Sequence, residues 1–257
     1  QRQFHHFVRT VPRRGRLVVN GEDRNLADVL AMGCWTPVVR FGIDAPDGAP
    51  LDWQARLLAA DGSAFEVLRA GAVLGEVRWP LLGRHNVMNA LAALAACDAL
   101  GVDVAAVMPA LAAFRSVKRR MELLGDARGV HVYDDFAHHP TAIATTLQGL
   151  RARVGEGRIV VAMEPRSNSM RLGAHAAALA PSLALADAVV FLHRPELEWD
   201  AGAVVAALRG EGTAVPDADA LLQRLREVVR AGDHVVFMSN GGFDGAPRRF
   251  LALLRDA

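Results

Sequence analysis

The chain has 257 residues, 52% hydrophobic and 22% charged, which excludes a disordered protein and suffices for one large domain or two ordinary ones. Its 29 basic and 28 acidic residues give a formal net charge of +1, so charge does not indicate nucleic acid or a membrane as a partner. Cys34 and Cys97 lie far apart in apolar surroundings, which is typical of a reduced intracellular protein. We therefore expect a cytoplasmic protein with no nucleic-acid or membrane partner.

The segment up to Pro80 is expected to form the edge of an α/β sheet. Residues 1–8 have the spacing of a helix end with Phe4, Phe7 and Val8 on one face, and the absence of an initiator Met indicates a chain that begins within a domain. A strand and a helix follow, and four short strands separated by turn residues then predict antiparallel pairing. These elements are expected at residues 16–20, 22–32, 37–41, 51–59, 65–70 and 72–79.

Two helices are expected next. Asn86 is well suited to cap the first of them, which ends at Gly101, because its side chain can accept a hydrogen bond from an unpaired backbone N–H. The second is expected at residues 102–114, and it leads into the basic segment Lys118-Arg119-Arg120. We place a domain boundary here, which divides the chain into domains 1–117 and 118–257.

Beyond Arg120, strands alternate with helices, which predicts a mostly parallel sheet covered by helices on both faces. The strands are expected at residues 130–134, 159–163, 188–192 and 234–238, and the helices at residues 141–151, 171–180, 201–208, 218–229 and 248–255. In such sheets, ligands bind where strands end and helices begin. The loops that follow the strands are therefore the candidate sites.

Polar residues are concentrated in four segments. They are residues 83–89, 134–140, 164–170 and 239–245. Asn86 and Asn89 lie three apart at a helix start, where two amides can bind an adenine edge or an anion, or can simply complete the turn. Asp134 and Asp135 are consistent with a metal pair, with a carboxylate that binds ribose, or with one capping group and one solvated charge.

Several catalytic motifs are absent from the sequence. It has no Gly-Lys-Ser/Thr, and hence no phosphate-binding loop of its own, and it has neither G-x-S-x-G nor HExxH. His138 and His139 are adjacent in an extended segment, so they point in different directions and do not predict a zinc site. Gly241-Gly242 is a weak nucleotide signature because its spacing is not G-x-G-x-x-G. We assign no catalytic residue and no metal ligand to this chain.

Taken together, these segments resemble the Mur ligase family. The matching residues are Met32-Gly33-Cys34-Trp35, Gly83-Arg84-His85-Asn86 with Asn89, Arg119-Arg120-Met121-Glu122, Asp134-Asp135-Phe136-Ala137-His138-His139-Pro140, Glu164-Pro165-Arg166-Ser167-Asn168-Ser169-Met170 and Met238-Ser239-Asn240-Gly241-Gly242-Phe243. Within the family, the sequence is most similar to the ligases that join UDP-N-acetylmuramate to L-alanyl-γ-D-glutamyl-meso-diaminopimelate in peptidoglycan recycling. The resemblance implies an α/β fold, with part of a central ATPase domain followed by a Rossmann-like C-terminal domain with a mostly parallel sheet.

The resemblance also implies roles for individual residues. Asn86 and Asn89, beside His85, match the pair near the adenine of ATP, Arg120 the arginine at the hinge that contacts the nucleotide, and Asp135 the aspartate that binds the ribose. The peptide residues are predicted from chemistry: the loop 164–170 supplies Arg166 with Ser167 and Asn168, followed by Arg171, and arginine suits the several carboxylates of the tripeptide, although either arginine can instead be a solvated surface charge. We also assign His138, His139, Asn240 and Gly241 to the peptide.

The same resemblance implies ATP and Mg²⁺ as cofactors, with UDP-N-acetylmuramate and the murein tripeptide as substrates. ATP phosphorylates a carboxylate in such enzymes, and the amine of the peptide attacks the acyl phosphate. The UDP-sugar domain, the phosphate loop and the Mg²⁺ ligands would precede Gln1, so we expect this chain alone to be inactive. The alternatives are a UDP-N-acetylmuramate:L-alanine ligase, a non-catalytic nucleotide- or peptide-binding module, and an NAD-dependent oxidoreductase, which rests only on the βα alternation and Gly241–Gly245.

Overall fold

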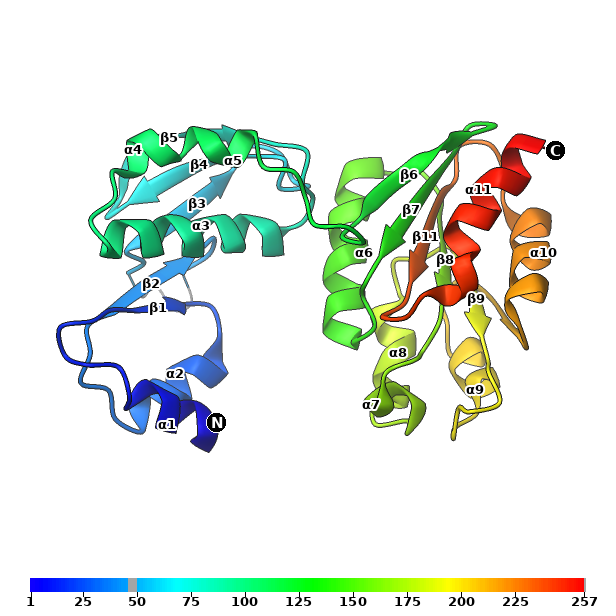
Figure 1. Cartoon of the computed structure of the whole chain (residues 1–257), viewed down its shortest axis with the longest axis horizontal. Helices are drawn as coiled ribbons and strands as arrows, with labels where there is room; N and C mark the ends of the chain where they lie inside the picture. Colours follow the sequence, from blue (N-terminus) through cyan, green and yellow to red (C-terminus); the bar gives the residue numbers. More distant parts are fainter. Residues whose placement is uncertain (46–49, 257) are drawn as a thin grey trace. The chain divides into compact units, whose positions relative to one another are not determined.

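The computed structural model describes residues 1–45 and 50–256. The chain divides into two compact units, Gln1–Arg115 and Ser116–Ala257 (Figure 1). Each unit has its own sheet and its own hydrophobic core. Within the described residues, none of the helices combines the length and the apolar character needed to cross a membrane.

The first unit contains a five-stranded sheet in the order β1-β2-β3-β4-β5. Its strands are β1 (Leu17–Asn20), β2 (Val38–Gly42), β3 (Trp53–Leu57), β4 (Ala64–Arg69) and β5 (Ala72–Arg78). The first three run parallel to one another, whereas β3, β4 and β5 are antiparallel. The antiparallel pairing predicted from the turns is therefore confirmed for β3, β4 and β5, but it was wrong for β2, which pairs with β3 in parallel.

Five α-helices complete the described part of this unit. They are α1 (Arg2–Val8), α2 (Arg24–Ala31), α3 (Arg84–Ala99), α4 (Val104–Val107) and α5 (Pro109–Ala112). Helix α3 buries an apolar stripe against the sheet, where Leu91 packs in one cluster with Trp53 and Phe65. On α1, only Val8 is buried, and Phe4 and Phe7 are each 63% exposed, so the apolar face expected there does not enter the core as a whole.

The single helix expected at residues 102–114 was a wrong prediction. Two short helices lie there instead, and α5 begins at Pro109 directly after Met108. The proline ring removes a backbone donor and clashes with the preceding turn, which explains why one helix does not continue through this position.

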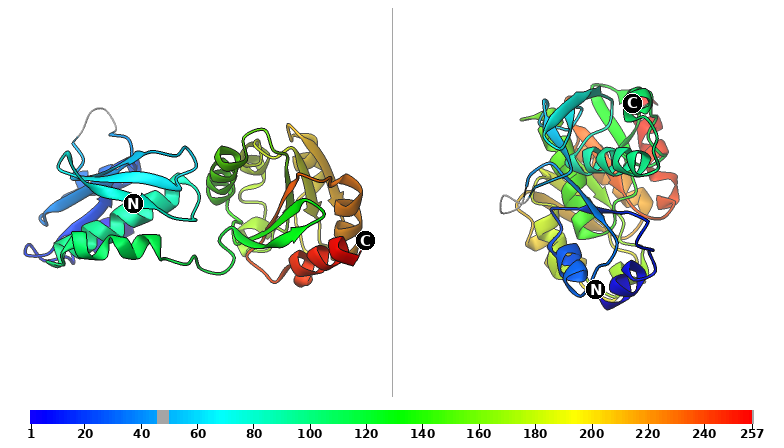
Figure 2. Two further views of the ribbon diagram at one scale, coloured as in Figure 1. Left: turned by 90° about the horizontal axis from the view of Figure 1, so that it is seen from above. Right: turned by 90° about the vertical axis from the view of Figure 1, so that its left-hand side faces the viewer.

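The second unit, which Figure 2 shows from two further sides, contains a six-stranded sheet. Its strand order is β10-β9-β8-β11-β7-β6. Its strands are β6 (Glu122–Ala127), β7 (Val130–Asp135), β8 (Ile159–Met163), β9 (Ala188–Leu192), β10 (Glu211–Val215) and β11 (His234–Met238). Every pair of neighbours is parallel except β6 and β7. The mostly parallel sheet predicted from the βα alternation is therefore confirmed.

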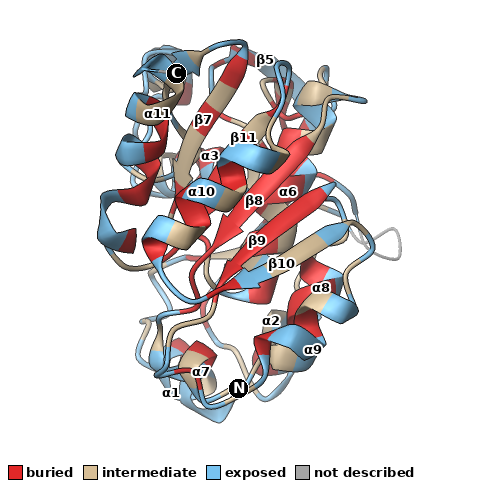
Figure 3. Cartoon of the chain, turned by 90° about the vertical axis from the view of Figure 1, so that its right-hand side faces the viewer, coloured by how far each residue is buried: buried red, intermediate tan, exposed pale blue. Residues whose placement is uncertain are grey.

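Helices cover both faces of this sheet, with α6, α8 and α9 on one and α10 and α11 on the other (Figure 3). The helices are α6 (Pro140–Val154), α7 (Asn168–Arg171), α8 (Ala176–Ser182), α9 (Ala201–Ala206), α10 (Ala218–Val228) and α11 (Ala246–Asp256), with a short 3₁₀ helix η2 (Phe243–Gly245) before α11. Strands β8 and β9 are buried along their whole length. This burial on both faces explains their continuous apolar sequences.

In the second unit, two edge strands and one helix break were not predicted. Both β6 and β10 lie at the ends of the strand order, and their sequences contain glycine and charged residues, which are depleted in strands but tolerated at an edge. The helix expected at residues 171–180 is interrupted between α7 and α8, because Gly173 adopts a φ of +74° there.

Candidate functional site

The carboxyl ends of β7, β8 and β11 lie at one edge of the second sheet. Met238, the last residue of β11, is in register with both Asp135 at the end of β7 and Met163 at the end of β8. The loops that follow these three strands therefore start side by side. They carry most of the candidate residues.

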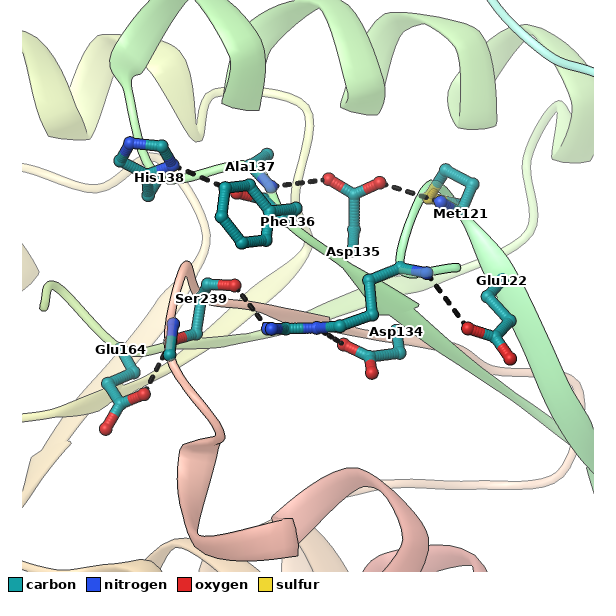
Figure 4. Close-up of polar contacts among 11 residues, drawn as sticks. Met121, Glu122, Asp134, Asp135, Phe136, Ala137, His138, Glu164 and Ser239 are labelled. Atoms are coloured by element: carbon teal, nitrogen blue, oxygen red, sulfur yellow. Dashed lines mark hydrogen bonds and ion pairs between the residues drawn. The ribbon is translucent and has the colours of Figure 1, made fainter. Parts of the chain in front are cut away.

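Asp135 anchors the loop that carries Arg120. Its carboxylate is only 3% exposed, and its two oxygens accept hydrogen bonds from the backbone N–H groups of Met121 at 2.7 Å and Ala137 at 2.8 Å (Figure 4). Burial raises the pKa of this carboxyl, while the two amides and nearby Arg120 oppose that rise. The structure thus shows Asp135 ordering the backbone, and its contact with ribose stays a prediction.

Arg119 was not singled out from the sequence, yet it makes more contacts in this loop than Arg120. Its Nε donates to Asp134 Oδ1 at 3.3 Å, and its Nη2 donates to the carbonyl of Ser239 at 2.5 Å. Its own backbone N–H donates to Glu122. Arg119 therefore joins the loop before β6 to the ends of β7 and β11, a set of contacts between distant residues for which the sequence contains no local signal.

Phe136 lies against two guanidinium groups. The ring centroid is 5.2 Å from Cζ of Arg119 and 5.6 Å from Cζ of Arg120, both within the range of cation–π attraction. The side chain of Arg120 makes no hydrogen bond or ion pair among the described residues, so its guanidinium is held by the ring and can still donate to a nucleotide. Its role in ATP binding stays a prediction.

The remaining predicted ATP residues, His85, Asn86 and Asn89, lie in the first unit on the first turns of α3. The expectation that Asn86 caps this helix was wrong. The helix starts two residues earlier, after Gly83 with a φ of +89°, and Asn86 donates its side-chain amide to the carbonyl of Leu82 at 2.7 Å. The positive φ of Gly83 turns the chain into the helix, so no side-chain cap is formed.

Arg166 and Gly241, two of the predicted peptide residues, are in close contact across the loops after β8 and β11. A Cβ placed on Gly241 would overlap Cδ of Arg166, so the arginine side chain covers the glycine backbone. Arg166 is exposed, and among the described residues its guanidinium has no hydrogen bond or ion pair. It is therefore available to a ligand anion.

The other predicted peptide residues in these loops have mixed environments. Ser167 caps α7 by accepting from the backbone N–H of Met170, and Asn168 is exposed in the first turn. Nε of Arg171 and Oδ1 of Asn240 are buried without a hydrogen-bond partner among the described residues. Their roles in peptide binding stay predictions.

His138 and His139 point to different neighbours. His138 Nδ1 lies 3.0 Å from the carbonyl of Phe136, whereas His139 accepts from the backbone N–H of Thr141 at the start of α6. The ring of His139 also contacts His175 edge-on, with centroids 4.5 Å apart. No group of three or more His, Cys, Asp or Glu side chains in the described ranges is arranged to hold a metal ion, so we place no Mg²⁺ ligand on these residues.

A buried ion-pair network lies below the exposed loops, and the sequence did not predict it. Glu164 is fully buried and accepts hydrogen bonds from Ser239 Oγ at 2.5 Å and from Arg194 Nε at 2.9 Å. Arg194 also pairs with Asp244 at 2.7 Å. The network links the ends of three parallel strands, and its members are too far apart in the sequence to form a recognisable motif.

Comparisons with known proteins give this geometry a family context. The family model of the Mur ligase middle domain matches residues 2–97, and that of the Mur ligase, glutamate ligase domain matches residues 119–241. The UDP-N-acetylmuramate--L-alanyl-gamma-D-glutamyl-meso-2,6-diaminoheptandioate ligase of Escherichia coli (strain K12) is 44% identical over 98% of this chain and 54% of that protein. The UDP-N-acetylmuramate--L-alanine ligase of Kineococcus radiotolerans is 36% identical over 98% of this chain and 55% of that protein.

A solved structure gives the same result. The murein peptide ligase of Psychrobacter arcticus 273-4 matches with a TM-score of 0.74 and 40% identity, over 100% of this chain and 54% of that one. The chain thus spans about half the length of the relatives that it matches. With two successive Mur ligase domain models covering most of its sequence, the chain belongs to the Mur ligase family.

Proposed function

We propose that this chain is part of an ATP-dependent ligase that joins UDP-N-acetylmuramate to L-alanyl-γ-D-glutamyl-meso-diaminopimelate. In this proposal, residues 1–117 are the C-terminal part of the ATP-binding domain, and residues 118–257 are the domain that receives the peptide. The observation that carries the proposal is the exposed, unpaired guanidinium of Arg166 packed on Gly241 at the ends of β8 and β11. The 44% identity to the Escherichia coli protein of that name supports it.

The chain's own residues contribute binding and orientation to the proposed reaction. Asn86 and Asn89 would bind the adenine, Arg120 would contact the nucleotide, and Asp135, besides contacting the ribose, holds the backbone of the Arg120 loop through Met121. ATP with Mg²⁺ would supply the phosphoryl transfer that activates the UDP-N-acetylmuramate carboxylate, at residues outside this chain. Since the chain contains no Gly-Lys-Ser/Thr, we assign none of its residues to the phosphates.

Arg166 suits a peptide with several carboxylates better than it suits a single amino acid. The tripeptide carries several carboxylates, and the planar guanidinium can donate two parallel hydrogen bonds to one of them. The alternative substrate, L-alanine, offers a single carboxylate. A peptide with several carboxylates is therefore the better match for the two arginines, Arg166 and Arg171, that lack ion pairs here among the described residues.

Substitution of Arg166 tests the proposal in the complete ligase. We expect Arg166→Lys to raise KM for the tripeptide about tenfold, equivalent to about 1.4 kcal/mol, because a lysine cannot form the bidentate contact. KM for ATP and for UDP-N-acetylmuramate should stay within about twofold, because the lost hydrogen bonds are made to the tripeptide alone. Steady-state phosphate release, with one substrate varied at a time, measures all three constants.

Arg226→Lys is the matched control, because Arg226 is exposed on α10, away from the strand ends. Its tripeptide KM should equal that of the unmodified ligase. A ligase that consumes ATP without dependence on the tripeptide, or an Arg166→Lys variant with an unchanged tripeptide KM, would contradict the proposed role.

A further inference from the structure

Glu164 is a buried carboxylate to which the proposed reaction assigns no task. It follows β8 directly and is 0% exposed. Burying a carboxylate is costly unless it is paired and hydrogen-bonded. In this chain the cost is offset by three contacts, from Ser239 Oγ at 2.5 Å and from Arg194 Nε and Nη2 at 2.9 and 2.8 Å.

The contacts of Glu164 lead to Arg166 by two parallel routes. Along the chain, Glu164 and Arg166 are two residues apart in the loop after β8. Across the sheet, Ser239 Oγ donates to Glu164 and accepts from the backbone N–H of Gly241 at 2.9 Å. Gly241 is the residue on which the Arg166 side chain lies, and a Cβ added there would overlap Cδ of Arg166. Glu164 is thus connected to both residues of the Arg166–Gly241 contact.

Glu164 also determines which arginine stays free. Together with Asp244 it neutralises Arg194, which lies between the two carboxylates. Arg166 has no acidic partner among the described residues. The site is therefore arranged with one arginine paired internally and a second arginine left for an anion.

We propose that Glu164 is a positioning residue: by holding the Ser239–Gly241 turn, it sets where the guanidinium of Arg166 lies, and thereby the affinity for the peptide carboxylate. The second half of this inference rests on the proposed function. A glutamine cannot replace Glu164 in this role. An NH₂ group facing Arg194 would meet a donor, and one facing Ser239 would reverse the hydrogen bond of the hydroxyl, while either orientation removes the charge that pairs with Arg194.

Two variants of the complete ligase test the effect on the substrate. We expect Glu164→Gln and Ser239→Ala each to raise KM for the tripeptide about tenfold, the effect of losing one buried hydrogen bond to a charged group, with kcat and KM for ATP changed less than about twofold. The double variant should be no worse than the more severe single variant, because both changes break one connected path.

Asp244→Asn is the matched control. It removes the other carboxylate from Arg194, but Asp244 is half exposed and contacts neither Ser239 nor Arg166 among the interactions described. Tripeptide KM should stay at the unmodified value. A circular-dichroism melt of each variant verifies that it is folded, and Ser239→Ala, which keeps the Glu164–Arg194 pair, is the variant to use should Glu164→Gln not fold.

A second measurement detects a change in the position of Arg166 and needs no substrate. In the 257-residue chain, the Nε–Hε resonance of Arg166 in a ¹⁵N spectrum should move in Glu164→Gln and Ser239→Ala and stay in place in Asp244→Asn. An unmoved resonance, or an unchanged tripeptide KM in the folded variants, overturns the inference. A moved resonance in a ligase that does not depend on the tripeptide upholds the positioning of Arg166 and overturns the proposed function alone.

Discussion

Asp134 and Asp135 are neighbours in β7 with separate tasks. Successive residues of a strand point to opposite faces, so Asp135 is directed to the Met121 and Ala137 backbone while Asp134 pairs with Arg119. Arg119 and Met121 both have positive φ, at 60° and 48°, a conformation that non-glycine residues adopt only when their surroundings enforce it. The carboxylate of Asp135 is one of those surroundings.

Loss of one acceptor at Asp135 should destabilise the protein. We expect Asp135→Asn to lower the free energy of unfolding by about 1–3 kcal/mol, because one of two buried N–H groups would then face an NH₂ group. Urea denaturation measures this change. Asp219→Asn is the control: Asp219 is a surface partner of Arg249, and its loss should cost less than about 1 kcal/mol. Equal costs for the two variants would show that Asp135 does not order the loop.

A glycine should be needed at position 241 to leave room for the Arg166 side chain, and not to allow a special backbone conformation. A methyl group at Gly241 would meet Arg166 Cδ, whereas one at Gly242 meets nothing within 4 Å. We expect Gly241→Ala to raise tripeptide KM about tenfold with a stability loss below about 1 kcal/mol, because the atom displaced is part of a flexible, exposed side chain. Gly242→Ala should change neither quantity. Similar kinetics in the two variants would remove Arg166 from peptide recognition.

At the scale of elements, the amino ends of β7 and β11 carry a second titratable cluster, at the edge of the sheet opposite the candidate site. The rings of His131 and His234 stack with centroids 4.6 Å apart, and Tyr133 Oη lies 3.1 Å from His234 Nδ1. Asp126 on β6 pairs with His131. Burial, followed by the neighbouring His131, lowers the pKa of His234 from its ordinary 6.5.

This lowered pKa makes stability dependent on pH. Below about pH 6.5 the unfolded chain binds a proton at His234 more readily than the folded chain does, so the free energy of unfolding should fall as pH decreases toward the folded pKa of His234. Above that range His234 contributes nothing to the change of the free energy of unfolding with pH. In His234→Gln this part of the slope should disappear, since glutamine does not titrate, and urea midpoints between about pH 7.5 and 5.5 measure it. Identical slopes in both proteins would assign the effect to other groups.

The central strands of the second sheet could be predicted from the sequence because strands that are buried on both faces have continuous apolar sequences. Strands β8, β9 and β11 lie at the predicted residues. The edge strands β6 and β10 could not be found in this way, because an edge strand does not have to be apolar on both faces. The breaks at Pro109 and Gly173 were missed because helical spacing continues on both sides of them.

The candidate site could be predicted only as a set of loops. Strand ends and polar density located Arg166, Gly241 and Asp135, and the sheet register brings their loops together. Arg119 and Arg194 were missed because their partners lie far away in the sequence, such as Ser239 for Arg119. Pairing at such distances depends on the folded sheet, which no local spacing encodes.

At the scale of the whole molecule, each of the two units has its own hydrophobic core. The core of Ser116–Ala257 is formed by its own strands and helices, including Phe237, Phe243 and Phe250. Trp53 and Phe65 belong to a separate cluster in Gln1–Arg115. Residues 112–118, which separate the two cores along the chain, are exposed. A domain with its own core and an exposed boundary can in general fold alone.

We therefore expect residues 116–257 to fold when they are produced alone. Trp199 is the one of the four tryptophans that lies in this unit, and its Nε1 donates to the Met170 carbonyl at 2.6 Å, so its fluorescence reports on the loop that carries Arg166. Urea unfolding followed by Trp199 fluorescence and by circular dichroism should give coincident, cooperative transitions. Asp135→Asn should shift both midpoints downward in this piece as in the intact chain. A piece without a cooperative transition, or one whose two signals separate, would show that the second unit depends on Gln1–Arg115 for its structure.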